Sequence, residues 1–204
     1  MKKSITKEQI VETALALMKN KSDLRLLNLR EIARTLGCAH TNLYNYFPSY
    51  NDLLWETHAA LQEIFMKMLT KKLDAATTAE LRLSCFFEAF ADMYLDNKGW
   101  FCLAWHECMG EERPRRDIET TESTNKALNK HISEIWKALS GEYPNADMTK
   151  RVLHNTHCYI VGEISNYLLG RGLIENEIEL KAYITCEAAL MFKLCLLGSD
   201  RIEL

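Results

Sequence analysis

The sequence of 204 residues is poor both in residues that interrupt helices and in residues that favour strands. It contains three prolines and eight glycines, and Gly37 is the only glycine before residue 99. Valine occurs three times against 29 leucines. Because strands favour β-branched residues, this composition predicts an all-helical chain.

Features of membrane-spanning and exported proteins are also lacking. The longest uncharged runs, such as 152–162, fall well short of the roughly 18 apolar residues that a membrane helix needs. The first eight residues have no apolar core of a signal peptide. The seven cysteines are odd in number and contain no CxxC pair, which argues against a disulfide framework. We therefore expect a cytoplasmic protein with no membrane contact.

Charge is distributed unevenly along the chain. Residues 1–50 carry eight Lys and Arg against four Asp and Glu, a net charge of +4, whereas the remainder carries 17 against 24, a net charge of −7. A basic module on an acidic body is typical of a protein that binds phosphate groups through one part only. The imbalance supports nucleic-acid binding without establishing it, since +4 is modest.

A polar segment between the first glycine and the first proline is the most informative part of the chain. Leu29, Ile32, Ala33 and Leu36 recur at helical spacing and predict a short helix over 29–36. A turn at Gly37 and a second, polar helix over 39–47 would complete a helix-turn-helix motif. In such motifs the second helix enters the major groove of DNA.

Helical periodicity and capping residues predict the rest of the organisation. The first helix begins after Thr6, which forms a capping box with Gln9, and Asn28 caps the helix over 29–36. The further helices are expected at 49–75, 78–97, about 100–110, 118–139, 146–169 and 176–197, with a loop over 111–117. We divide the chain into a three-helix DNA-binding head, residues 1–50, and a larger helical body for effector binding and dimerisation, residues 51–204.

The head resembles the DNA-binding domain of TetR-type (tetracycline-repressor-like) transcriptional regulators over about residues 6–56. The resemblance rests on the spacing Ile32-Ala33-x-x-x-Gly37 and Leu43-Tyr44-x-x-Phe47. It implies a homodimer that binds double-stranded operator DNA and is controlled by a small molecule, usually as a repressor.

Five of the expected DNA contacts follow from side-chain chemistry. Arg30 offers the planar fork that suits guanine O6/N7 or a phosphate, and Asn45 suits adenine N6/N7. The first turn of the recognition helix is formed by His40, Thr41 and Asn42, and this turn enters the groove in helix-turn-helix proteins. The alternative is a solvated polar face without a ligand.

Three further contacts are implied by the resemblance. Tyr44, Tyr46 and Tyr50 match positions that the family uses largely for the DNA backbone. Tyr50 stands where the family often has a lysine, so the salt dependence of binding should be flatter. Ala39 stands where the family often has Ser or Thr, so the recognition helix loses about 1 kcal/mol of capping unless Asn42 or water substitutes.

An aromatic stretch of the body lies where the resemblance places the effector pocket. Pockets are mostly apolar with few polar groups, which indicates a largely apolar small-molecule effector. For any one of these residues, ordinary core packing is the alternative. The predicted lining residues are Phe86, Phe90, Trp100, Phe101, Trp105 and His106.

Cys102 and His106 are four residues apart on one helical face and could supply two metal ligands. The spacing matches no standard zinc signature, so we expect neither a metal nor another cofactor and keep a thiol- or metal-sensing regulator as an alternative. An all-helical enzyme is the rival from another class. We find no phosphate loop, no HExxH motif and no supported nucleophile–base pair, and expect no enzymatic activity. A body that only scaffolds another protein is a third reading.

The last two long helices are the candidates for the dimer interface, as a symmetric two-fold bundle. Two DNA-binding heads held in a dimer would bind a pseudo-palindromic operator. Part of each helical stripe must instead be buried within one subunit. The predicted interface residues are Leu153, His157, Ile160, Ile164, Leu168, Ile184, Ala188 and Met191.

Overall fold

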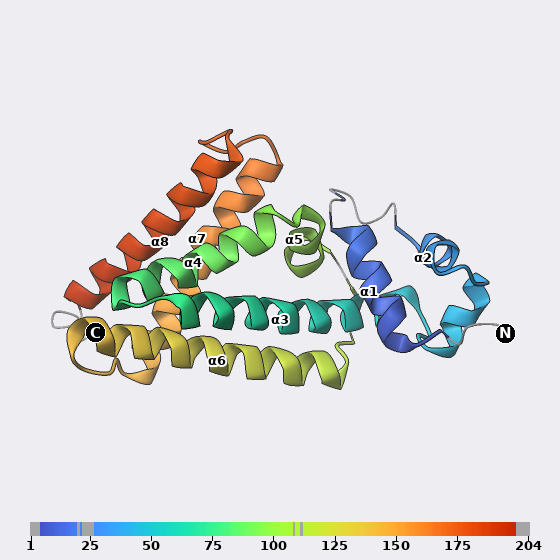
Figure 1. Cartoon of the computed structure of the whole chain (residues 1–204), viewed down its shortest axis with the longest axis horizontal. Coiled ribbons are helices and arrows are strands. Elements are labelled where there is room, and N and C mark those ends of the chain that lie inside the picture. The colour runs from blue at the N-terminus through green and yellow to red at the C-terminus, as the bar shows by residue number, and fades with distance from the viewer. Residues whose placement is uncertain (1–4, 20, 22–26, 108, 111, 199–204) are drawn as a thin grey trace. The chain divides into compact units, whose positions relative to one another are not determined.

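The computed structural model describes residues 5–19, 21, 27–107, 109–110 and 112–198, and these contain helices but no strand (Figure 1). This confirms the predicted all-helical fold. None of the helices within that range is long and apolar enough to span a membrane. The helices are α1 (Lys7–Met18), α2 (Leu29–Leu36), the 3-10 helix η2 (His40–Asn45), α3 (Tyr50–Ala75), α4 (Ala79–Leu95), α5 (Lys98–Trp105), α6 (Arg115–Ser140), α7 (Ala146–Leu168) and α8 (Glu177–Gly198).

The chain divides into two compact units. The first comprises Met1–Ile64 and Asn97–Glu122, and the second comprises Phe65–Asp96 and Ser123–Leu204. The first unit therefore adds part of α3, all of α5 and the start of α6 to the residues we assigned to the DNA-binding head. The functional division at residue 50 stays a prediction.

Local sequence signals explain the helix ends of the first unit. Thr6 and Gln9 form the predicted capping box at the start of α1. The side chain of Asn28 accepts hydrogen bonds from two backbone amides at the start of α2. α2 ends at Gly37, whose φ of 71° lies in the left-handed region that favours glycine. Ile32 and Leu43 are fully buried, so the two short helices pack on each other.

Three boundaries differ clearly from expectation, and one of them is the end of α5, at Trp105 rather than about residue 110. The recognition segment is a 3-10 helix over His40–Asn45 rather than an α-helix over 39–47, and Ala39 supplies no side-chain cap. Short segments adopt the 3-10 form readily, and here the missing cap removes one source of α-helical stability. α6 begins at Arg115, inside the expected loop, because the carbonyl of Pro114 accepts a bond from the amide of Ile118 and Asp117 lies favourably in the first turn.

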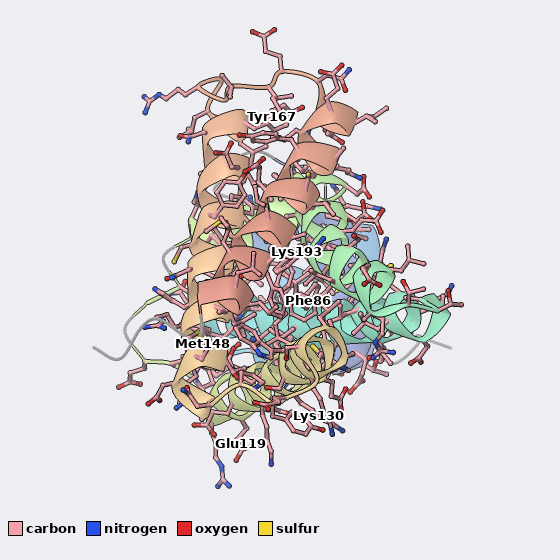
Figure 2. The ribbon with its side chains drawn as sticks, turned by 90° about the vertical axis from the view of Figure 1, so that its left-hand side faces the viewer. Phe86, Glu119, Lys130, Met148, Tyr167 and Lys193 are labelled. Carbon is pink, nitrogen blue, oxygen red and sulfur yellow. The ribbon has the colours of Figure 1, made fainter. Side chains whose placement is uncertain are left out.

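The second unit is built on α4, α7 and α8. α7 and α8 form an antiparallel pair joined by a turn at Gly170, and Tyr167 lies at this end of the pair, with Met148 at the opposite end (Figure 2). The core contains Phe86 and Phe192, both with no exposed surface. The ring centroids of Trp136 and Phe192 lie 5.4 Å apart in an edge-on arrangement.

Candidate nucleic-acid interface and effector region

The recognition segment presents most of its polar side chains to solvent. Thr41, Asn42 and Asn45 are exposed, as is Tyr44 with half of its surface accessible, whereas His40 is half-buried. Leu43 is fully buried and Phe47 is nearly so, as expected for residues that fix the segment in the core. The segment therefore leaves its hydrogen-bonding groups available to a ligand.

A cleft of about 1000 Å³ runs between α1 and the helix-turn-helix. Asn42, Asn45 and Tyr46 line one wall, and Gln9 and Glu12 of α1 line the other. Glu12 places an acidic group in this cleft, which disfavours phosphate there. Asn42 and Asn45 thus border a cavity, while Thr41 and Tyr44 are exposed without lining it.

A basic cluster adjoins the recognition segment and includes a residue that the sequence analysis missed. Lys21, Arg30 and Arg34 line a shared cavity of about 480 Å³, together with Glu31. Arg34 is exposed and also lines the cleft. It lies four residues after Arg30, so both guanidinium groups rise from one face of α2. The four-residue spacing of Arg30 and Arg34 in the sequence could have identified Arg34 as a candidate DNA contact.

Two of the tyrosines that were predicted to contact DNA direct their hydroxyl groups to other parts of the protein. The hydroxyl of Tyr46 donates a hydrogen bond to the backbone carbonyl of Ile5. The hydroxyl of Tyr50 is buried, and burial, with further contributions from Glu107 and Glu31, raises its pKa to about 12. A phosphate contact by Tyr50 would therefore require its side chain to turn outward.

α5 is fastened to the end of α1. The amide of Gly99 donates to the carbonyl of Lys19 at 3.1 Å, and the indole of Trp100 donates to the carbonyl of Leu15 at 2.8 Å. A Cβ atom added at Gly99 would lie 1.8 Å from the carbonyl oxygen of Met18, so only glycine permits this approach. The helix that carries three of the predicted pocket residues therefore contacts the first helix of the predicted DNA-binding head directly.

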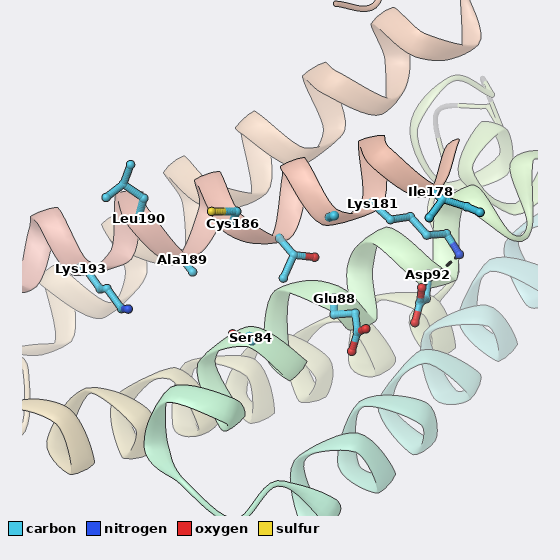
Figure 3. Close-up of a pocket in the computed structure, with 11 residues that line it drawn as sticks. Ser84, Glu88, Asp92, Ile178, Lys181, Cys186, Ala189, Leu190 and Lys193 are labelled. Atoms are coloured by element: carbon cyan, nitrogen blue, oxygen red, sulfur yellow. Dashed lines mark ion pairs between the residues drawn. The ribbon is translucent and has the colours of Figure 1, made fainter. Parts of the chain in front are cut away.

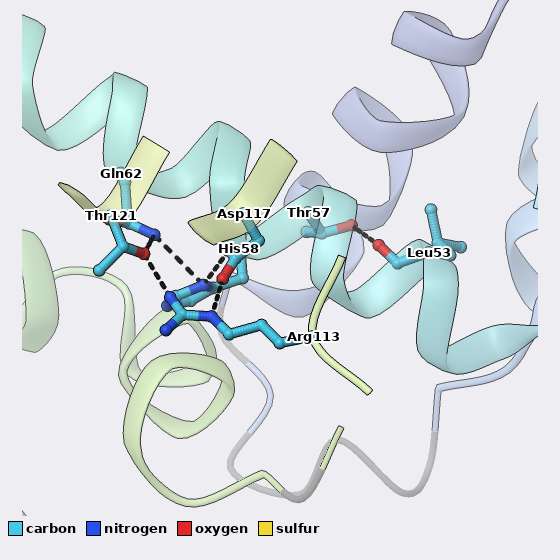
Figure 4. A network of polar contacts seen from close by, with 7 residues as sticks. All are labelled: Leu53, Thr57, His58, Gln62, Arg113, Asp117 and Thr121. Atoms are coloured by element: carbon cyan, nitrogen blue, oxygen red, sulfur yellow. Dashed lines mark hydrogen bonds and ion pairs between the residues drawn. The ribbon is translucent and has the colours of Figure 1, made fainter. Parts of the chain in front are cut away.

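A polar network joins α3 to the start of α6 (Figure 4). Asp117 has 1% of its surface exposed, and its carboxylate accepts hydrogen bonds from His58, at 2.6 Å, and from Arg113. Gln62 donates to Thr121 at 2.9 Å. Burial alone would raise the pKa of Asp117, but the hydrogen bonds from His58 and Arg113 outweigh it and hold the pKa below its usual value.

A second set of charges ties the same helices to α1. Lys7 pairs with Glu56 at 2.6 Å, and Arg116 pairs with Glu56 and, at 3.4 Å, with Glu63. Glu56 is thus shared by a cation from α1 and a cation from α6. Ion pairs therefore connect α1, α3 and α6 within the first unit.

The six predicted pocket residues fall in both units. Phe86 and Phe90 belong to the core of the second unit, where the Phe90 ring lies 4.6 Å from Phe65 and 5.0 Å from His157 between centroids. Trp100, Phe101, Trp105 and His106 belong to α5 and its C-cap in the first unit. Phe101 is fully buried, whereas Trp105 and His106 are exposed. Their assignment to an effector pocket stays a prediction.

His157 is a half-buried polar residue beside the aromatic core of the second unit. Burial, with a smaller contribution from His154, lowers its pKa to about 4, so the imidazole is neutral at pH 7. A neutral imidazole among phenylalanine rings can hydrogen-bond the polar group of an otherwise apolar ligand. The ring of His157 contacts Phe90 within the subunit, and its assignment to the dimer interface stays a prediction.

The other proposed interface residues are mostly buried within the subunit. Leu153, Ile160, Ile164, Ile184 and Ala188 are buried, and Leu168 and Met191 are half-buried. The exposed apolar residues of this region lie on α8 and at the turn between α7 and α8. These residues are Leu169, Leu173, Ile178, Leu190, Leu194 and Leu197.

Cys102 and His106 occupy the end of α5. Cys102 is half-buried, its carbonyl accepts the amide of His106, and the His106 ring packs edge-on against Phe101 at 5.0 Å. Across the described residues, no group of three or more His, Cys, Asp or Glu side chains is arranged to hold a metal ion.

Several solved structures with a similar arrangement of helices are those of transcriptional regulators. A TetR-family regulator from Bordetella parapertussis 12822 has a TM-score of 0.64 and 14% identity, over 91% of this chain and 92% of that one. The fold is that of TetR-type regulators. A TetR variant from Acinetobacter baumannii AYE in complex with minocycline has a TM-score of 0.63 and 15% identity, over 93% of this chain and 96% of that one.

A FadR regulator from Bacillus subtilis in complex with stearoyl-CoA has a TM-score of 0.63 and 12% identity, over 95% of this chain and 99% of that one. No protein-family model and no curated protein matches the sequence. The likeness to TetR-type regulators is therefore one of fold, and the chemistry of the site must carry the functional argument.

Proposed function

We propose that this protein is a ligand-responsive transcriptional regulator, most simply a repressor, that binds a pseudo-palindromic operator as a homodimer. The observation that carries the proposal is an exposed polar recognition segment, held by Leu43 and Phe47, within a TetR-type fold. Asn45 and Thr41 supply groups that suit base edges, and Arg30 and Arg34 supply cations for phosphates or guanine. Tyr44 completes the contact with the DNA backbone.

The dimer would use the outward face of α7 and α8. Leu194 and Leu197 have 58% and 74% of their surface exposed and lie three residues apart on α8. Exposed apolar stripes of this kind mark interaction surfaces, and a two-fold contact covers the same stripe on both subunits. Leu194→Glu is expected to give a monomer, with Leu81→Glu on the exposed part of α4 as the matched control.

Control by an effector would act through α5 and α3. A largely apolar molecule that contacts α5 or the Phe86–Phe90 region would displace α5 from α1, or shift α3, and so change the positions of the two DNA-binding heads. The contacts of Gly99 and Trp100 with α1 support this route. The related structures with minocycline and stearoyl-CoA show that this fold admits ligands of different chemistry. The effector must bind one state more tightly than the other.

Selection of bound sequences from a random DNA pool tests the proposal. Wild type should enrich an inverted repeat. Asn45→Ala and Thr41→Ala should each weaken binding of that repeat about 5- to 150-fold, as the loss of one base contact does. Asn125→Ala, an exposed asparagine of α6, is the matched control. Failure of the wild type to enrich any sequence at low salt would count against DNA recognition by this head.

A further inference from the structure

A groove on the second unit lies outside both the recognition segment and the aromatic core. It runs between α4 and α8, has a volume of about 690 Å³, and contains none of Phe86, Phe90 or His157 among its lining residues (Figure 3). Volumes of 300–1,000 Å³ are typical of small-molecule sites. Its lining extends from Ile178 to Lys193 of α8, which corresponds to about 22 Å of helix.

One end of the groove is occupied by acids that already have partners. Asp92 pairs with Lys72 at 2.8 Å and with Lys181 at 3.1 Å, and Lys181 also pairs with Asp96 at 2.6 Å. Lys72 pairs with Glu88 at 2.8 Å as well. Three carboxylates therefore share two ammonium groups, which leaves this end with one excess negative charge. An anionic group is repelled here.

The other end carries a cation without a partner. Lys193 is exposed, and no acid pairs with it in the described part of the chain. Ser84 of α4 lies at the same end of the groove (Figure 3) and offers a hydroxyl group. Ser84 is the sixth residue of α4, beyond the first turn in which the helix macrodipole acts, so the attraction for an anion rests on Lys193 and the hydroxyl. Glu80, one turn before Ser84, opposes it in part.

Apolar and small side chains form the wall between the two ends. Ala182, Ala189 and Leu190 of α8 line this stretch, together with the small polar side chains of Thr185 and Cys186, and Ile178 lies at the acidic end (Figure 3). Ile178 and Leu190 expose 79% and 46% of their surfaces. Exposed apolar side chains of this size gain free energy when a ligand covers them. The groove is thus long and apolar in the middle, cationic at one end and anionic at the other.

We propose that the α4–α8 groove is a second ligand site, which binds an elongated molecule with an apolar body and a single anionic head. The head pairs with Lys193 and accepts a hydrogen bond from Ser84, and the body lies along Ala189, Leu190 and Ala182. The charge asymmetry sets one orientation, because the end around Asp92 repels the head. The site is independent of operator binding and of the effector region around Phe90.

Calorimetric titration of the full chain with dodecanoate tests the proposal, with dodecyltrimethylammonium as a probe of equal length and opposite charge. Dodecanoate should bind, and the cationic probe should bind at least about tenfold more weakly. Lys193→Gln should weaken dodecanoate binding about tenfold, whereas Lys150→Gln, at an exposed lysine of α7, should leave it unchanged. Glu80→Gln should tighten it. Equal affinity for the two probes, or an unchanged affinity in Lys193→Gln, would overturn the proposal.

A blocking variant distinguishes this groove from the other possible sites. Ala189→Trp fills the middle of the groove and should abolish binding while the urea midpoint and the operator affinity stay at the wild-type values. If binding survives in Ala189→Trp but is lost in Phe90→Ala, the probe occupies the aromatic core and the groove is not the site. If Ala189→Trp instead converts a dimer to a monomer, the groove is a subunit contact and the proposal fails.

Discussion

The interiors of the two units contain different kinds of interaction, although the second unit also carries ion pairs nearer its surface, such as that of Lys181 with Asp92. In the first, Asp117 lies buried between His58 and Arg113, and Glu56 is shared by Lys7 and Arg116. In the second, the rings of Phe86, Phe87 and Phe90 pack on one another with centroid distances of 5.3 and 5.6 Å. Directional ionic contacts have few acceptable geometries, whereas apolar packing depends mainly on volume.

This difference suggests a division of labour. A network of hydrogen-bonded charges that links α1, α3 and α6 would suit the transmission of a signal to the proposed DNA-binding head, because such networks switch between discrete arrangements. An aromatic core tolerates ligands that replace one apolar surface by another. The two kinds of stabilisation can be distinguished by removing a buried ring, by lowering the pH and by neutralising a buried carboxylate.

Removal of a ring from the second unit should have the largest effect. Phe86→Ala deletes a fully buried side chain, and we expect a loss of about 3–5 kcal/mol in the free energy of unfolding, measured by urea denaturation. Leu173→Ala, at a side chain with 82% of its surface exposed, should change it by less than about 0.5 kcal/mol. A loss below about 1 kcal/mol in Phe86→Ala would mean that this core is loosely packed.

Acid should destabilise the second unit before the first. The pKa of His157 is about 4 in the folded protein and about 6.5 in the unfolded chain, so the unfolded chain binds the extra proton as the pH falls. The stabilising effect of the neutral imidazole is complete above pH 6.5 and is lost between pH 6.5 and 4, at a cost of about 3 kcal/mol. The pKa of Asp117 is lowered from 3.8, so its contribution is lost only below that pH.

The midpoints of urea denaturation, measured from pH 7.5 to 3.5, test the pH ranges expected for His157 and Asp117. His157→Leu should flatten the dependence between pH 6.5 and 4, whereas His154→Leu, at an exposed position three residues earlier, should not. If His154→Leu flattens the profile as much as His157→Leu does, burial of His157 is not the cause.

Neutralisation of one buried carboxylate should weaken the first unit. Asp117→Asn keeps the size of the side chain but removes the charge that His58 and Arg113 approach, at a cost of about 2 kcal/mol. Glu119→Gln breaks the exposed pair with Arg115, formed at 2.6 Å, and should cost less than about 1 kcal/mol. Equal losses in the two variants would show that burial adds nothing to the Asp117 network.

Local signals were sufficient for most helix ends, because a cap involves residues three or four positions apart. The capping box of Thr6, the cap at Asn28 and the turn at Gly37 were all predicted and are present. The 3-10 form of the recognition segment was not predicted, since helical periodicity alone does not separate i+3 from i+4 hydrogen bonding over six residues.

Contacts between distant residues were beyond the reach of the sequence. His58 and Asp117 are 59 residues apart, and neither has a motif around it that points to the other. Gly99 lies between the helices predicted over 78–97 and about 100–110, but the sequence does not show that it permits the close approach of α5 to the carbonyl of Met18. The same limit applies to α7 and α8. Periodicity shows which residues share one face of a helix, but not whether that face packs within the subunit or against a partner. Five of the predicted interface residues are buried within the subunit.

The smallest expected effect is that of removing a helix cap, and each unit offers one cap for comparison. Asn28 accepts hydrogen bonds from the amides of Arg30 and Glu31 at 3.0 and 3.1 Å, and Thr78 accepts one from the amide of Leu81 at 3.2 Å. Asn28→Ala and Thr78→Ala should each lower the free energy of unfolding by about 1 kcal/mol. Their effects on operator affinity should differ, because the Asn28 cap orders the turn that carries Arg30, whereas the Thr78 cap orders a turn of α4 with no DNA contact.

A gel-shift titration with the selected operator measures this difference. Asn28→Ala should weaken binding several-fold and Thr78→Ala should leave it unchanged, although their urea midpoints fall together. Equal operator affinities in the two variants would mean that the first turn of α2 contributes no contact to DNA, and Arg30 would then have to be removed from the proposed interface. Recognition would in that case rest on the segment from His40 to Asn45 and on Arg34, which lies beyond the capped turn.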